Sequence, residues 1–311
     1  MSFKYALALL LALTLAAKAE PIAISTTPIA SFGLGNATEF GPLGWRGGLQ
    51  LSSPDKTFGG LSGLTLSEDC ESLLAVSDTG RWFRAALSYE NGKLAGLSQG
   101  EWAPILDTKG KPPASKARGD AEALAALGAG RYMVGFESRP RIGIYDIGKD
   151  GLAARFQLLK SPKAVTDGPR NGELESAGLI AAGPWKDYYF AISENNTDPD
   201  NNIRGWLWRS WKTMPFSVKR FEDYAITDAA VLPDGDVLIL ERSFSSGSLP
   251  GMTIRRFKTS AMKAGATVEP ELLFSGRIPL YAIDNMEGIA LCRRGGETRL
   301  TVVSDNNLNP A

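Results

Sequence analysis

The chain has 311 residues, of which 43% are hydrophobic and 22% are charged, and this balance excludes a disordered protein and predicts a globular one with a large core. It contains no histidine, which excludes Ser-His-Asp and Cys-His nucleophiles, histidine-bound zinc and imidazole acid–base catalysis. Basic and acidic residues number 34 each, which argues against a nucleic-acid partner. Any chemistry must therefore use carboxylates, arginines, hydroxyls or a bound metal.

The first 19 residues have the pattern of a secretory signal peptide. Lys4 precedes an apolar run over residues 6–16, and Ala17-Lys18-Ala19 is a small-x-small cleavage site. The run is shorter than the roughly 20 residues that a membrane-spanning helix needs, and no later segment qualifies. We therefore expect cleavage after Ala19, export to the periplasm or the medium, no membrane span, and one mature domain at residues 20–311.

Five segments of the mature chain repeat one pattern. Each has a short strand rich in small residues, a turn, and a second strand of continuous apolar residues that stops near an acid. The segments start at residues 62, 122, 175, 228 and 287, which gives spacings of 60, 53, 53 and 59 residues. Such a period indicates a repeat architecture. The continuous apolar strands indicate burial on both faces, between neighbouring sheets.

The fold predicted from these hairpins is all-β, a single β-propeller of five to six blades. The last repeat reaches Asp305, only six residues before the C-terminus, so it supplies two strands. Residues 22–34 and 44–52 are expected to supply outer strands and to close the ring. The alternative is an open β-sandwich, which does not explain the regular recurrence.

Acidic residues stand at both ends of the hairpins. The start of the first strand lies beside the end of the second in an antiparallel hairpin, so we expect these ends to meet at one mouth of the central channel. The resulting pairs are Ser62 with Asp78, Glu122 with Glu137, Glu175 with Glu194, Asp228 with Glu241, and Glu287 with Asp305.

So many carboxylates would repel and raise one another's pKa unless a cation neutralised them. Ca²⁺ suits oxygen ligands and needs no histidine, so it is the expected cofactor. The predicted metal ligands are Asp78, Glu122, Glu137, Glu175, Glu194, Asp228, Glu241, Glu287 and Asp305, with Glu137, Glu175 and Glu287 as the candidate catalytic carboxylates.

Arginines near the ends of the second strands are the other possible counter-ions. Arg81, Arg139 and Arg242 are predicted to bind substrate phosphate, because guanidinium groups hold phosphate in a bidentate manner. The alternative is that acids and arginines form structural ion pairs between blades.

The chain has two cysteines, Cys70 in the first repeat and Cys292 in the last. A closed ring would make these repeats neighbours, and an oxidising compartment would allow a disulfide. Two separate thiols are the alternative, because sequence does not give the distance between the sulfurs.

The repeats also carry a series of motifs in a specific order. They are Gly60-Leu-Ser-Gly-Leu, Val76-Ser-Asp-Thr-Gly-Arg, Asp120-Ala-Glu-Ala-Leu, Phe136-Glu-Ser-Arg-Pro-Arg-Ile, Asn171-Gly-Glu-Leu-Glu, Leu232-Pro-Asp-Gly-Asp, Leu240-Glu-Arg-Ser, Asn285-Met-Glu-Gly-Ile and Val303-Ser-Asp-Asn-Asn. This series resembles the phytase-like family, also called the esterase-like activity of phytase family, over about residues 57–307. The resemblance implies an exported bacterial protein related to the β-propeller phytases, in which calcium ions at the channel mouth bind substrate phosphate and activate water.

Three functions are compatible with these observations. The first is a Ca²⁺-dependent phosphoester hydrolase that acts, as a monomer, on a small and possibly phosphorylated substrate. The second is a metal-dependent ester or lactone hydrolase, with Asn171, Asn195 and Asn285 as neutral ligands. The third is a non-catalytic propeller that binds a ligand or partner, with the acids around a structural ion.

Overall fold

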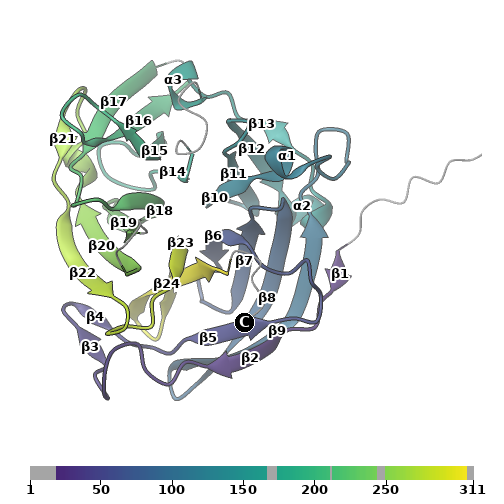
Figure 1. Ribbon diagram of the computed structural model, residues 1–311. Helices are drawn as coiled ribbons and strands as arrows, with labels where there is room; N and C mark the ends of the chain where they lie inside the picture. Colours follow the sequence, from purple (N-terminus) through teal and green to yellow (C-terminus); the bar gives the residue numbers. More distant parts are fainter. Residues whose placement is uncertain (1–18, 167–173, 211, 244–248, 307–311) are drawn as a thin grey trace, which may run out of the picture.

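A computed structural model describes residues 19–166, 174–210, 212–243 and 249–306 and shows an all-β protein whose sheets surround a common centre, as in a β-propeller (Figure 1). Four sheets have four or five strands each, and the fifth repeat is a two-stranded sheet. The prediction of five to six blades is therefore wrong, because the described chain forms four blades. Residues 1–18 of the predicted signal peptide, and Asn171, lie outside the described residues.

The sheets follow one another in chain order. The first consists of β6 (Leu61–Leu66), β7 (Ser72–Ser77), β8 (Arg81–Glu90) and β9 (Lys93–Pro104), with β1 (Glu20–Pro21) paired to β9. The second consists of β10 (Ala121–Gly128), β11 (Arg131–Phe136), β12 (Arg141–Asp146) and β13 (Gln157–Leu158). The third consists of β14 (Ser176–Leu179), β15 (Tyr189–Thr197), β16 (Ile203–Arg209), β17 (Lys212–Val218) and β21 (Thr267–Val268). The fourth consists of β18 (Ala225–Val231), β19 (Val237–Ser243), β20 (Gly251–Phe257) and β22 (Glu271–Arg277), and the fifth hairpin of β23 (Asn285–Arg294) and β24 (Glu297–Asp305).

Short elements connect these sheets or lie beside them. They are β2 (Ser25–Pro28), β3 (Glu39–Phe40), β4 (Leu43–Gly44), β5 (Leu49–Ser52), the helices α1 (Lys116–Gly119), α2 (Ile147–Asp150) and α3 (Lys163–Thr166), and two 3₁₀ turns, η1 (Gly151–Ala153) and η2 (Thr259–Ala261). None of the helices in the described ranges is long and apolar enough to cross a membrane.

The first strands of the five hairpins, β6, β10, β14, β18 and β23, lie around the centre, and β23 packs between β18 and β6 (Figure 1). The second strands of the first four hairpins are largely buried, as their continuous apolar sequences predict, whereas β24 of the fifth hairpin is only partly buried. Val76, Val134, Phe190 and Ile239 each have an exposed fraction of 0%. Hydrophobic clusters fill the spaces between neighbouring sheets. This packing fixes the position of each hairpin, and so it also fixes where the first strand of each hairpin begins at the mouth of the central channel.

The N-terminal segment does not complete a fifth blade by strand pairing. β2 pairs with β5 and β3 with β4, and among the described residues none of the four pairs with β23 or β24. Their backbone groups are used in these two small sheets, so closure of the ring by N-terminal strands is not confirmed. The segment instead covers the fifth hairpin with side chains. Phe32 stacks on Trp45 beside Phe274 of the fourth sheet, and Arg46 forms an ion pair with Glu297 of β24.

A disulfide joins the first and last repeats. The Sγ atoms of Cys70, in the turn between β6 and β7, and Cys292, on β23, are bonded, and their Cα atoms are 5.3 Å apart. The Tyr89 hydroxyl donates a hydrogen bond of 2.8 Å to the backbone carbonyl of Cys70, and the Arg294 guanidinium lies over the Tyr89 ring. The bond fastens the fifth hairpin to the first sheet.

Candidate functional site

A shared irregularity shapes the rim of four of the five hairpins. The register between first and second strands shifts by one residue, which leaves Ser62, Glu122, Thr227 and Glu287 as the extra residue of a β-bulge. A bulge turns the extra side chain out of the normal alternation of the strand. Equivalent side chains of different hairpins therefore point to similar places, and two of the four are glutamates.

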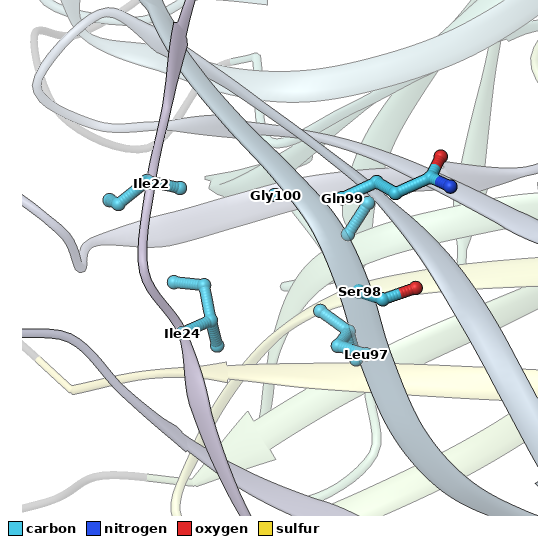
Figure 2. A pocket seen from close by; sticks show the side chains of 7 residues that line it. Ile22, Ile24, Leu97, Ser98, Gln99 and Gly100 are labelled. Carbon is cyan, nitrogen blue, oxygen red and sulfur yellow. The ribbon is translucent and has the colours of Figure 1, made fainter.

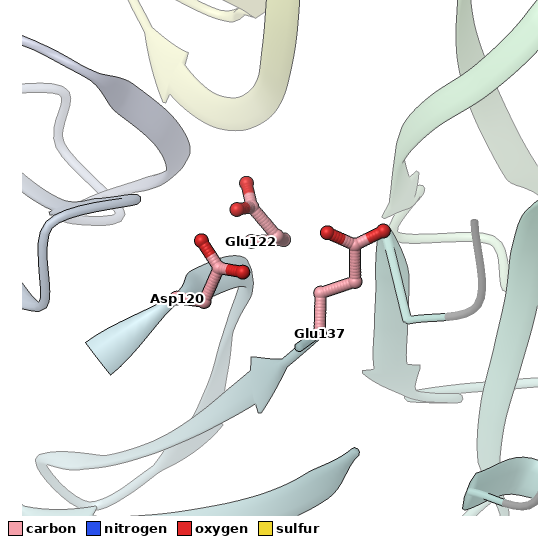
Figure 3. A group of neighbouring side chains, drawn as sticks. All are labelled: Asp120, Glu122 and Glu137. Atoms are coloured by element: carbon pink, nitrogen blue, oxygen red, sulfur yellow. The ribbon is translucent and has the colours of Figure 1, made fainter. Parts of the chain in front are cut away.

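Carboxylates from several hairpins gather at this rim. Carboxylate oxygens of Asp120, Glu122 and Glu137 lie within 4.8 Å of one another, and so do those of Glu137, Glu175 and Glu194. Figure 3 shows the first of these groups. Glu137 belongs to both groups and links the second sheet to the third. The whole set, here called the carboxylate ring, is Asp78, Asp120, Glu122, Glu137, Glu175, Glu194, Glu287 and Asp305.

Two glutamates of the ring have pKa values raised by burial and by neighbouring carboxylates. Burial raises the pKa of Glu175 well above its usual value, and the carboxylates of Glu122, Glu194 and Glu137 add to the effect. Burial likewise raises the pKa of Glu122, helped by Asp120 and Glu287. Glu175 is 7% exposed, and within the described residues no hydrogen bond or ion pair reaches its carboxylate. A buried acid without a partner among the described residues is costly, and the grouped carboxylates could hold a metal ion.

One flank of the ring is neutralised by a lysine. Lys116 Nζ lies 3.0 Å from Asp78 Oδ2 and 2.7 Å from Asp120 Oδ1, so it joins the first sheet to the second. Lys116 stands on α1, whose end is fixed by a close approach of Gly119 to Gly80. A Cβ atom on Gly80 would lie 2.8 Å from the Gly119 Cα.

The opposite flank is neutralised by an arginine. The Arg242 guanidinium donates to Glu287 Oε1, to the Asn285 side-chain oxygen and, at 3.1 Å, to Glu194 Oε1. Asn285 Nδ2 also donates to Glu287 Oε1 at 2.7 Å. Burial raises the pKa of Glu287 to about 8 despite the opposing effect of Arg242, and Asp305 and Glu194 raise it further. Glu287 is therefore largely protonated near neutral pH.

The fourth hairpin does not bring its predicted acids into the ring. Asp228 follows the bulge residue, and its two carboxylate oxygens accept backbone N–H groups of Ala229 at 2.7 Å and Ile289 at 2.8 Å. Glu241 turns to the opposite face of β19, where Arg255 donates to both of its oxygens, at 2.6 and 2.5 Å. Thr227 and Arg242 stand at the rim instead. The expected placement of Asp228 and Glu241 is thus wrong by one residue of strand register.

The Glu241–Arg255 pair gives a test of this correction. Glu241→Gln is expected to reduce the free energy of unfolding by about 3 kcal/mol, because it leaves a buried guanidinium without its counter-ion. Urea unfolding measures this effect. Glu101→Gln, which breaks the more exposed pair with Arg84, is the matched control and should cost less than about 1 kcal/mol. Equal losses in the two variants would contradict the assignment of Glu241 to a buried ion pair.

The three predicted phosphate-binding arginines have different surroundings. Arg242 contacts the ring, as described. The Arg81 guanidinium lies over the Trp102 ring, 5.7 Å from its centroid, on the outer part of the first sheet. Arg139 is exposed and follows Glu137 and Ser138 at the end of β11.

Sequence reasoning missed two members of the site. Asp120 lies two residues before Glu122 and accepts a hydrogen bond from Ser138, and Lys116 lies four residues before Asp120. The Asp-x-Glu spacing was the available signal for Asp120. Lys116 had no such signal, because its segment has no counterpart in the other repeats. Of the proposed neutral ligands, Asn285 lies in the site, and Asn195 accepts a hydrogen bond from Arg220.

A small hollow lies elsewhere, on the outer part of the first sheet. It has a volume of about 150 Å³ and is lined by Ile22, Ile24, Ala85 and the β9 segment 97–100 (Figure 2). It contains no acidic or basic side chain, so it offers none of the chemistry gathered at the ring.

Comparison with known proteins gives one family match. A family model described as "Phytase-like: Esterase-like activity of phytase" matches residues 56–308, which confirms the resemblance seen in the motifs. No curated protein matches the chain. Similar solved structures include the Neurospora crassa Pan2 WD40 domain, at 10% identity over 76% of this chain and 71% of that chain, with a TM-score of 0.38. The Dos1 propeller is 15% identical over 78% of this chain and 54% of that chain, with a TM-score of 0.36. The Myceliophteria thermophila Cps50 (Swd1) β-propeller domain is 11% identical over 74% and 59%, with a TM-score of 0.34.

Proposed function

We propose that this chain, which belongs to the phytase-like family described as esterase-like activity of phytase, is a Ca²⁺-dependent phosphoester hydrolase whose active site is the carboxylate ring. The observation that carries the proposal is the buried Glu175 carboxylate, which points into a group of acids without a described cation partner. The protein would act as an exported monomer, in the periplasm or the medium, on a small phosphorylated substrate.

The donor set of the ring fits calcium. All of its side chains offer carboxylate oxygens, which hard cations prefer, and the ring contains no nitrogen or sulfur ligand that would favour zinc. Glu122, Glu137 and Glu175 would hold the ion, with Asp120 and Glu194 at the edges of the site. A bound Ca²⁺ would neutralise the substrate phosphate and lower the pKa of a bound water.

The chain's own residues would orient the substrate and supply a proton. Glu287 Oε1 is held by Arg242 and Asn285, so Oε2 is the oxygen available for a proton. A pKa of about 8 leaves Glu287 largely protonated at neutral pH, as a general acid for the leaving alkoxide must be. Arg139, which is exposed and lies two residues after Glu137 in the chain, would contact the phosphate, and Arg242 would hold the acid in position.

Turnover of a chromogenic phosphate monoester tests the proposal. Purified protein is expected to release p-nitrophenol from p-nitrophenyl phosphate with added calcium chloride and to stop when EGTA is added in excess. Chelation should also lower the melting temperature, because a metal bound to the native state stabilises it. Turnover that is unaffected by EGTA, or absent on every phosphoester offered, would refute the assignment.

An ester or lactone hydrolase is the second candidate, and the neutral side chain of Asn285 beside Glu287 favours it. An aryl acetate and a lactone belong in the same assay. Calcium-dependent activity on these substrates, without activity on phosphates, would reverse the ranking. A tightly bound ion without any turnover would favour a non-catalytic binding role.

A further inference from the structure

We propose that Lys116 takes the place of a second divalent cation at Asp78 and Asp120, so that the carboxylate ring accepts a single calcium ion at its centre. This inference rests on the proposed function, because it concerns the ion that the ring would hold. It assigns to Lys116 a role in setting metal stoichiometry.

The position of the lysine is the first step. Its ammonium group lies between carboxylates of two different sheets, 3.0 Å from Asp78 Oδ2 and 2.7 Å from Asp120 Oδ1. The two carboxylates hold this ammonium group between them, so the position is filled by a positive charge. A divalent ion at this point would have to displace a fixed positive charge or bind beside it.

In each of the two groups of acids, one carboxylate already has a cation partner. Asp120 is engaged by Lys116, and Glu194 is engaged by Arg242 at the opposite flank. The ion pairs therefore involve Asp120 in the first group and Glu194 in the second. Glu122 and Glu175 have no ion pair within the described residues, and Glu137 lies in contact range of both groups.

The buried centre supplies an observation that is independent of the lysine. Glu175 has an exposed fraction of only 7%, and no described donor or cation contacts its carboxylate. Carboxylate oxygens of Glu137 and Glu194 lie within 4.8 Å of one of its own. Glu175, which has no ion pair within the described residues, thus lies between two flanks that already have cations, and one ion at this point would neutralise it.

Removal of the lysine should expose the second position. Asp78 and Asp120 would then face each other across the gap between the first two sheets without a cation. Asp78 Oδ1 already lacks a hydrogen-bond partner in the described structure, so both of its oxygens would be available as ligands. Asp78 Oδ1 fits at this position because Gly60 has no side chain. A Cβ atom on residue 60 would lie 2.0 Å from this oxygen.

Counting bound calcium tests the inference. Equilibrium dialysis against calcium chloride should give one ion per chain for the wild type and two for Lys116→Met, with the second ion bound at least 10-fold more tightly than any second ion in the wild type. Lys116→Met/Asp78→Asn should return the count to one. Lys111→Met, an exposed lysine of the same connection, is the matched control and should keep one ion. Circular dichroism melts establish that each variant is folded.

The outcomes separate this inference from the proposed function. One ion in both the wild type and Lys116→Met would overturn the role of Lys116 while leaving a calcium site in place. Two ions in the wild type would overturn it as well. A wild type and a variant that bind no calcium would overturn both the inference and the metal-dependent function.

Discussion

Glu175→Met is expected to abolish calcium-dependent turnover, by about 10³-fold or more, and at the same time to stabilise the chelator-treated protein. The loss of turnover follows from removal of a carboxylate that we propose binds the calcium ion. The stabilisation follows because methionine keeps the unbranched chain and removes a buried carboxylate that has no described partner. An unpaired buried charge of this kind costs about 2 kcal/mol or more, which corresponds to a rise in melting temperature of roughly 5 °C.

The stabilisation should depend on pH with a definite sign. The folded-state pKa of Glu175 is raised above its unfolded value, so the stability it contributes is complete below the unfolded pKa and is lost as pH rises through the folded one. The variant has no carboxylate at this position, so its free energy of unfolding does not fall in this way. The difference in free energy of unfolding between the variant and the wild type should therefore grow between pH 5 and pH 9 in EGTA. Calorimetry across this range measures the difference.

A matched control separates the site from glutamate removal in general. Glu90→Met removes an exposed glutamate at the end of β8 and should change neither the chelated stability nor the turnover. The prediction fails if Glu175→Met keeps the calcium-induced rise in melting temperature, because the residue would then lie outside the ion's ligands.

The hairpin repeat predicted much of the site because antiparallel pairing fixes which strand ends are neighbours. Glu122 with Glu137, and Glu175 with Glu194, were placed at one rim by this rule, and their carboxylates do gather there. The rule needs the correct register, however. In the fourth hairpin Thr227, and not Asp228, occupies the bulge position that Glu122 and Glu287 occupy elsewhere.

The same one-residue offset explains Glu241. Neighbouring side chains of a strand point to opposite faces, so with Arg242 directed to the rim Glu241 must face Arg255 on β20. The sequence shows both an acid and an arginine at the end of this strand, and it does not show which of them faces inward. Only the bulge, which has no signature in residue type, decides between them.

The blade number could not be obtained from the period alone. Division of the mature length by the repeat length counts the N-terminal residues as blade material. In the structure these residues form two small sheets of their own and contribute aromatic side chains, such as Phe32 and Phe40, to the hydrophobic cluster between the fourth sheet and the fifth hairpin. Side-chain packing of this kind leaves no periodic pattern, because it depends on a few large residues at irregular spacing.

Reduction of the Cys70–Cys292 disulfide is expected to lower the free energy of unfolding by about 5 kcal/mol, the largest stability effect of any single bond in the described chain. The bond joins residues that are 222 positions apart, and the chain-entropy gain increases with the length of the closed loop. The fifth hairpin also has two strands where the other sheets have four or five, so it has less hydrogen bonding to hold it in place.

The loss of stability on reduction of the disulfide should begin in the fifth hairpin. β23 contacts β6 and β18, and its remaining links to the first sheet's side include the disulfide and the arginines that lie over Tyr89. Hydrogen exchange in dithiothreitol should therefore accelerate first in residues 285–305, ahead of the four larger sheets. Cys70→Ser/Cys292→Ser should melt like the reduced wild type and be insensitive to dithiothreitol. Equal melting temperatures for oxidised and reduced wild type would show that packing holds the last hairpin without the disulfide, and the bond would then have no part in fastening the ends of the repeat array.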